Sequence, residues 1–85
     1  ENNTCSGNQY DGFSALGSSS PAFSNNSALN NVNVGIGFYE NATGSASGNI
    51  CAFNNWGIYI EAGANPSLDG NNCYSNTTED VLDKR

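Results

Sequence analysis

Apolar residues alternate with residues of a different character in several short stretches of the chain. The alternating apolar positions are Phe13 and Ala15, Ile36 and Phe38, and Ile58 and Ile60. A period of two predicts short strands with one buried face. No stretch of ten or more residues keeps a helical period, because Gly, Asn and Pro interrupt every candidate. The pattern therefore predicts an all-β chain.

These stretches recur at a nearly fixed interval, which reveals an internal repeat. Cys5, Ala28, Cys51 and Cys73 are separated by 23, 23 and 22 residues. Asn lies two residues before each of them, at Asn3, Asn26, Asn49 and Asn71, and three residues after each, at Asn8, Asn31, Asn54 and Asn76. The repeat units are 3–25, 26–48, 49–70 and a partial unit 71–85, and unit 49–70 contains every landmark of the pattern.

Each unit contains three short strands and cannot close a core alone, but stacked copies can. Equivalent strands of successive units then pair in parallel, about 4.8 Å apart. This stacking predicts three internal apolar ladders and one ladder of asparagines. The apolar ladders are Phe13, Ile36, Ile58 and Val81; Ala15, Phe38 and Ile60; and Cys5, Ala28, Cys51 and Cys73. The asparagine ladder is Asn3, Asn26, Asn49 and Asn71. We expect the Asn residues to turn corners in the left-handed conformation and to hydrogen-bond along the stack.

The repeat also resembles that of a known family. The patterns Gly-Asn-x-Cys/Ile-x-x-Asn, Gly-Ile-x-Ile and Pro-x-Leu-x-Gly-Asn are similar to the right-handed parallel β-helix repeat of the pectate-lyase-like superfamily, especially its Asn-rich carbohydrate-binding and sugar-hydrolase-type members. The resemblance covers residues 1–82 and implies a right-handed parallel β-helix of about 3.5 turns. In the second unit Ser45 and Ser47 stand where the other units have Pro and an apolar residue, so we expect an under-packed third strand there.

Length and charge exclude several classes of function. The 85 residues form one domain at most, and the net charge is −6, with Lys84 and Arg85 the only basic residues. Binding to nucleic acid or to an anionic membrane surface requires many more cations. No apolar run approaches the roughly 20 residues of a membrane span. We therefore expect no nucleic-acid partner and no membrane insertion.

The chain offers little for catalysis or metal binding. It has no His, and its eight carboxylates are scattered, with Glu40 and Glu61 the one geometrically plausible pair. The resemblance implies that catalytic relatives carry clustered Asp with a basic residue, or Gly-His-Gly and Arg-x-Lys motifs, and none of these occurs here. We expect no enzyme activity in this segment, no cofactor and no metal site.

The three cysteines are explained by the repeat as small buried apolar residues. Cys51 and Cys73 would also lie on neighbouring turns, within the Cα range of a disulfide. Cys5 is two turns from Cys51 and could not join it. Core packing and a Cys51–Cys73 disulfide therefore both remain open.

The aromatic residues give the best signal for binding. Tyr39 and Tyr59 should point outward, Trp56 lies at the corner before Gly57, and Glu61 follows the same strand. Exposed aromatic rings on a rigid sheet can stack on sugar rings, so Tyr39, Trp56, Tyr59 and Glu61 are our ligand-binding candidates. The alternative is structural, with Tyr59 covering Gly37 on the preceding turn.

The sequence thus favours a rigid, non-catalytic scaffold segment that binds an oligo- or polysaccharide. One alternative is a piece of a polysaccharide-active lyase, hydrolase or epimerase whose catalytic turns lie elsewhere, and another is a protein-interaction scaffold in a multidomain regulatory protein. We expect the segment to belong to a longer protein or to associate end to end through its open turns. An extracellular or cell-surface location fits this reading, and an intracellular one is compatible with it.

Overall fold

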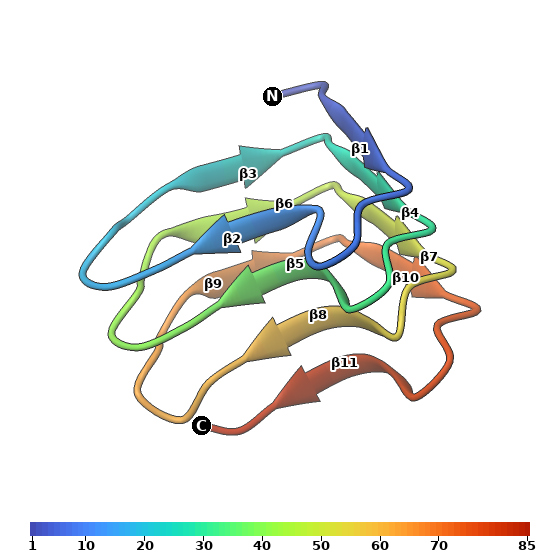
Figure 1. Cartoon of the computed structure of the whole chain (residues 1–85). Helices are drawn as coiled ribbons and strands as arrows, with labels where there is room; N and C mark the ends of the chain where they lie inside the picture. Colours follow the sequence, from blue (N-terminus) through green and yellow to red (C-terminus); the bar gives the residue numbers. More distant parts are fainter.

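The computed structural model describes all 85 residues and contains eleven short strands and no helices. The chain winds in successive turns from one end of a stack to the other, and the two termini lie at opposite ends (Figure 1). The strands are β1 (Thr4–Ser6), β2 (Phe13–Ala15), β3 (Ala22–Ser24), β4 (Ser27–Leu29), β5 (Val34–Phe38), β6 (Ser45–Ser47), β7 (Ile50–Ala52), β8 (Trp56–Ile60), β9 (Ser67–Asp69), β10 (Asn72–Tyr74) and β11 (Glu79–Asp83).

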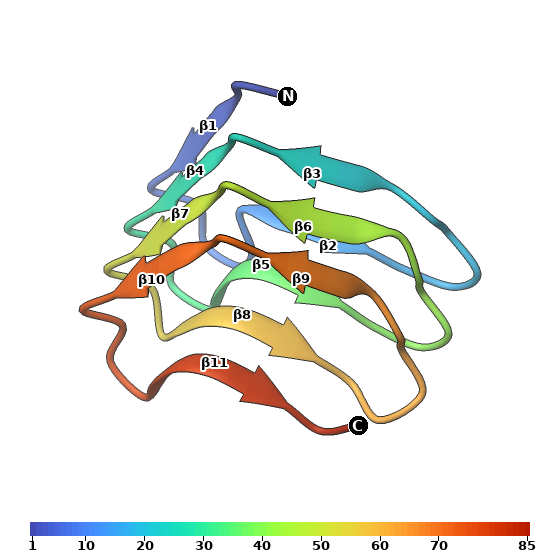
Figure 2. The ribbon, with the colours of Figure 1, turned by 180° about the vertical axis from the view of Figure 1, so that it is seen from behind.

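The strands form three parallel sheets that enclose the interior of the solenoid. Their orders are β1-β4-β7-β10, β2-β5-β8-β11 and β3-β6-β9 (Figure 2). Each of the first three turns contributes one strand to each sheet, and the partial fourth turn contributes β10 and β11. Every strand pair is parallel and joins equivalent positions of neighbouring turns. The predicted all-β parallel solenoid, with three short strands per turn, is confirmed.

The three predicted apolar ladders are present in the strand register. Their successive Cα partners are Phe13, Ile36, Ile58 and Val81; Ala15, Phe38 and Ile60; and Cys5, Ala28, Cys51 and Cys73. Ile36 and Ile58, in the middle turns, are completely buried, whereas Val81 is 43% exposed. The core therefore consists of stacked side chains that are covered from both sides in the middle of the molecule.

The third strand of the second unit differs from the prediction by one residue. Ala46, and not Ser47, aligns with Phe23 and Leu68, while Ser47 aligns with Ser24 and Asp69. Ala46 is completely buried, so the inward position is apolar, although small. The prediction was wrong because Ser45-Ala46-Ser47 contains no bulky side chain that would mark the inward position.

The asparagines form two hydrogen-bonded ladders along the stack. In each ladder the backbone N–H of one Asn donates to Oδ1 of its equivalent in the next turn, over 2.8–3.2 Å. At Asn76, where the structure has no further Asn, backbone N and Nδ2 both donate to Asp80 Oδ1, over 3.3 and 2.9 Å. Asp80 therefore ends this ladder by supplying the acceptor itself.

The left-handed residues lie directly before the ladder asparagines, which corrects the expected role of Asn3, Asn26, Asn49 and Asn71. At the corner before the first strand of each turn, the residues with positive φ are Asn2, Asn25, Gly48 and Gly70. At the corner after that strand they are Gly7, Asn30, Phe53 and Ser75. The ladder asparagines themselves are absent from this set because their side chains point inward, where they bond the neighbouring turns. Corner turning and ladder bonding are thus divided between adjacent residues.

Unit 49–70 is one residue shorter than the two units before it, and the missing residue is at a corner. Asn31 and Asn54 are equivalent at a spacing of 23 residues, whereas Val34 and Trp56 are partners at a spacing of 22. The backbone N–H groups of Asn55 and Trp56 both donate to the carbonyl oxygen of Asn33, at 2.9 and 3.1 Å. The corner between β7 and β8 therefore absorbs the change in length, and the strands keep their register.

Candidate functional site

The candidate site lies on the outer surface of the β2-β5-β8-β11 sheet. Trp56 begins β8 as the partner of Val34, and Tyr59 is the partner of Gly37. The backbone ladder continues one residue beyond these strands, since Glu61 N–H donates to the Phe38 carbonyl oxygen at 2.9 Å. Residues at the strand exits are therefore stacked in the same way as the strand residues.

The structure brings the three predicted aromatic residues together. Tyr39 stacks on Tyr59, with ring centroids 5.6 Å apart and planes inclined by 29°. Trp56 meets Tyr59 edge to face, with centroids 5.9 Å apart. The ammonium group of Lys84 lies 5.4 Å from the centre of the Tyr59 ring, within the range of a cation–π interaction. We call Tyr39, Trp56 and Tyr59 the aromatic cluster; all three are half-buried.

Tyr39 is held in place at both ends of its side chain. Its ring lies over Gly37, because a Cβ atom placed on Gly37 would come within 2.5 Å of the ring. Its hydroxyl donates to Asp11 Oδ2 at 2.6 Å. The alternative in which Tyr59 covers Gly37 is therefore corrected: the ring over Gly37 belongs to Tyr39, which follows β5 and folds back across it.

Asp11 is the polar anchor of the cluster, and the sequence reasoning missed it. Besides the Tyr39 hydroxyl, its carboxylate accepts hydrogen bonds from Ser14 Oγ at 2.9 Å, Asn33 Nδ2 at 3.0 Å and the backbone N–H of Val34 at 3.2 Å. Burial, together with the hydrogen bond to this carboxylate, raises the pKa of Tyr39 above its usual range. The only signal for this role in the sequence was that Asp11 lies 23 residues, or one repeat unit, before Val34, and therefore stacks on it.

The two candidate carboxylates have different surroundings. Glu61 is half-buried and lies close enough to Tyr39 for its negative charge to contribute to the raised pKa of that tyrosine. Glu40 Oε1 accepts a hydrogen bond from the backbone N–H of Gly17 at 2.9 Å, on the preceding turn. Glu40 is thus directed away from the turn that carries Glu61, and the structure does not assemble the two as an acid–base pair.

The indole nitrogen of Trp56 is the one buried side-chain polar atom without a hydrogen-bond partner. Trp56 occupies the shortened corner, where two backbone N–H groups already share one carbonyl oxygen. A buried unpaired donor costs free energy. The position of Trp56 is therefore determined by packing against Tyr59 and not by a polar contact.

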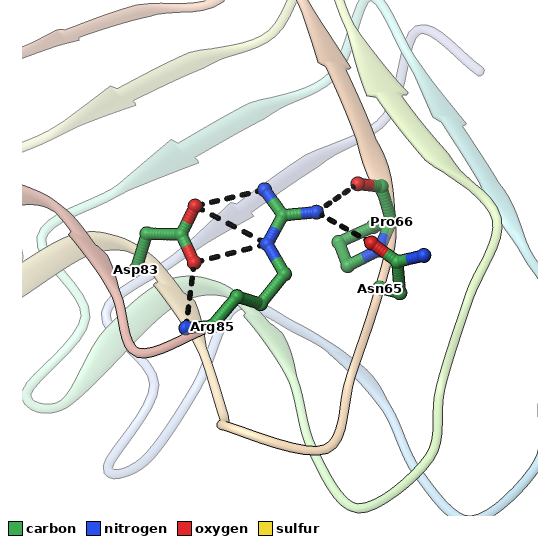
Figure 3. Close-up of polar contacts among 4 residues, drawn as sticks. All are labelled: Asn65, Pro66, Asp83 and Arg85. Carbon is green, nitrogen blue, oxygen red and sulfur yellow. Dashed lines mark hydrogen bonds and ion pairs between the residues drawn. The ribbon is translucent and has the colours of Figure 1, made fainter.

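Arg85, two residues after β11, connects this part of the chain to Asn65 and Pro66, which precede β9 in the preceding turn (Figure 3). Its guanidinium group pairs with Asp83, with Nη2 2.8 Å from Oδ2, and Nη1 donates to the Pro66 carbonyl oxygen at 2.7 Å and to Asn65 Oδ1 at 3.0 Å. Hydrogen bonds from Arg85 lower the pKa of Asp83 to about 2. The two basic residues thus have separate contacts, Lys84 above Tyr59 and Arg85 at the corner.

A second aromatic pair, also missed as a site, lies on the β1-β4-β7-β10 sheet. Phe53 and Tyr74 meet edge to face, with centroids 5.8 Å apart, and are 53% and 41% exposed. Phe53 has a φ of 60°, at a corner where the other turns have Gly7, Asn30 and Ser75. These rings are more exposed than those of the aromatic cluster, but no charged or hydrogen-bonding network surrounds them.

The aromatic cluster lies on an open surface. The structure contains no pocket, and no group of three or more His, Cys, Asp or Glu side chains is placed to hold a metal ion. No helix has the length and apolar character needed to cross a membrane. A ligand of this site would therefore lie along the face of the sheet.

Comparison with known proteins identifies the fold family. A family model described as right handed beta helix region matches residues 1–82, which is nearly the whole chain. No significant match to a curated protein sequence or to a solved structure was found.

Proposed function

The chain belongs to the right-handed β-helix region family, and on that premise we propose that it is a non-catalytic scaffold whose aromatic cluster binds an oligosaccharide. The observation that carries the proposal is the contact of Tyr39, Trp56 and Tyr59 on one face of a rigid sheet. Two neighbouring turns supply these rings, so they form one surface and not three isolated side chains.

The chemistry of this surface suits a sugar. The C–H face of a pyranose is apolar and packs on an aromatic ring, while its hydroxyl groups need donors and acceptors around that ring. Glu61 and Lys84 lie beside the cluster and supply an acceptor and a donor. Because Asp11 and Gly37 hold Tyr39 in place before any ligand binds, little side-chain freedom is lost on binding.

The open shape of the site favours an extended ligand over a small enclosed one. Small molecules are usually bound in concave sites that bury most of their surface. A polysaccharide chain can instead contact several turns in succession along a flat face. We therefore propose a polysaccharide as the natural partner and the cell surface or extracellular space as the place where the chain meets it.

Affinity electrophoresis through gels containing soluble polysaccharides, together with a glycan array, tests this proposal. We expect at least one glycan to retard the protein, and Trp56→Ala or Tyr59→Ala to weaken binding about tenfold or more, which corresponds to about 1.4 kcal/mol. Tyr10→Ala is the matched control, because Tyr10 is 75% exposed and its ring pairs with none of the three aromatic rings of the cluster. Absence of binding to every glycan, or equal binding by the variants with an unchanged melting temperature, would refute the proposal.

A further inference from the structure

Two cysteines face each other across neighbouring turns of the first sheet. Cys51 in β7 and Cys73 in β10 are direct Cα partners in parallel strands. Such partners are about 4.8 Å apart, which lies within the Cα separation of disulfides, about 4.4–6.8 Å. Both thiols are free in the structure. The register therefore places two reduced sulfur atoms at a separation that a disulfide can span.

The two thiols differ in their surroundings. Cys51 is completely buried, whereas Cys73 is only half-buried. Interaction with the Cys73 thiol, together with burial, raises the pKa of Cys51, whereas interaction with the Cys51 thiol lowers the pKa of Cys73. Cys73 is thus the thiol that an oxidant reaches and the one that more readily becomes a thiolate, which is the reactive form.

Cys5 has the same ladder position but cannot take part. Ala28 separates it from Cys51, so the two are not neighbours in the sheet. Ala28 is itself completely buried, which shows that alanine fits this ladder. Cys5 therefore serves as a control cysteine that has no partner on a neighbouring turn. Ala28 indicates that a Cys→Ala substitution in this ladder should be tolerated.

We propose that Cys51 and Cys73 form a disulfide that joins the third and fourth turns when the protein meets a small-molecule disulfide such as oxidised glutathione. The thiolate of Cys73 attacks one sulfur of glutathione disulfide, which breaks the glutathione S–S bond and releases one glutathione thiolate. The sulfur of Cys51 then attacks Cys73 Sγ in the mixed disulfide and displaces the second glutathione. Two protein thiols are oxidised and one glutathione disulfide is reduced to two glutathione molecules. The protons of Cys73 and Cys51 pass, one each, to the two departing glutathione thiolates.

The bond would act on the part of the stack that is paired on one side only. Within the 85-residue chain β10 pairs with β7 alone. A covalent link between Cys51 and Cys73 keeps the fourth turn on the third when the surrounding hydrogen bonds open. Oxidation is therefore expected to raise the melting temperature and to slow amide exchange in β10 and β11.

The test is oxidation of the folded chain with glutathione disulfide, followed by intact mass measurement and peptide mapping without reduction. We expect a product that has lost two hydrogen atoms and contains a Cys51–Cys73 peptide pair, with a higher melting temperature than the reduced protein. Cys5→Ala should behave in the same way. Cys51→Ala should stop at a mixed disulfide of glutathione on Cys73 and show no rise in melting temperature. A wild-type product that carries only glutathione adducts, or that links two chains through Cys5 or Cys73, would overturn the proposal.

Discussion

Each buried asparagine is hydrogen-bonded to both neighbouring turns. Asn54 Oδ1 accepts from the backbone N and the Nδ2 of Asn31, while Asn54 Nδ2 donates to the Ala28 carbonyl oxygen and to Asn76 Oδ1. These bonds pair backbone groups that the corner withdraws from the sheet ladder, and unpaired buried groups are costly. The abundance of Asn in this chain is therefore largely a consequence of its corners.

Asn54→Ala is expected to lower the free energy of unfolding by about 3 kcal/mol, because the Asn31 N–H and the Ala28 carbonyl both lose a buried partner. Chemical denaturation measures the change. Asn72→Ala is the control, since Asn72 is exposed and its side chain forms no hydrogen bond, and it should change stability by less than about 0.5 kcal/mol. Equal effects of the two substitutions would show that the ladder bonds contribute little.

Tyr39 makes stability depend on alkaline pH. Its pKa is raised in the folded state, so the unfolded chain releases this proton first as the pH passes about 10. The contribution is present below the unfolded pKa and is lost as the pH rises above it. Urea denaturation between about pH 8 and pH 11 should therefore show a falling stability that Tyr39→Phe makes less steep. A wild-type slope in Tyr39→Phe would contradict this role.

The strands and corners depend on glycines for two different reasons. At Gly35 there is no room for a side chain: a Cβ atom there would lie 2.6 Å from the Gly57 carbonyl oxygen and 2.8 Å from Asn54 Nδ2. Gly70 has open space around it but a φ of +64°, at a corner where Asn25 adopts 54°. The first kind keeps adjacent turns at sheet spacing, and the second turns the chain.

Gly35→Ala is expected to destabilise the protein by about 2 kcal/mol, because backbone and ladder atoms must move apart to admit the methyl group. Gly70→Asn should change the free energy of unfolding by less than about 0.5 kcal/mol, since Asn is tolerated at that corner. Thermal and chemical denaturation of the two variants measure the contrast. A tolerated Gly35→Ala would mean that the turns have more room than the structure indicates.

The sequence was sufficient to predict most elements because each turn repeats the same residue types at the same positions. The ladders through Ile36 and Ile58 followed directly from the period. The comparison of repeat units gave the wrong register at Ser45-Ala46-Ser47, because these similar small residues do not distinguish the inward from the outward position. The contact of Tyr39 with Asp11 was not predicted either, because the direction in which a side chain folds across a sheet cannot be derived from the order of residue types.

On the scale of the whole molecule, the middle turns should be the most stable region. β5 and β8 pair with a strand on each side, whereas β1, β2, β10 and β11 each pair on one side only. Strands paired on both sides must open two ladders before their amides exchange. Hydrogen exchange followed by NMR should show the slowest amides around Ile36 and Ile58 and the fastest in β1 and β11. Uniform exchange along the stack would argue against a core centred on the middle turns.

The shortened corner between β7 and β8 has a use in protein engineering. The chain loses one residue there, between Asn54 and Trp56, and regains it at the corresponding corner of the next turn, while all neighbouring strands keep their partners. Length at this corner is thus independent of strand register. A peptide or epitope grafted into this corner of a middle turn should be displayed on the outside of the stack, while the sheets above and below it remain intact.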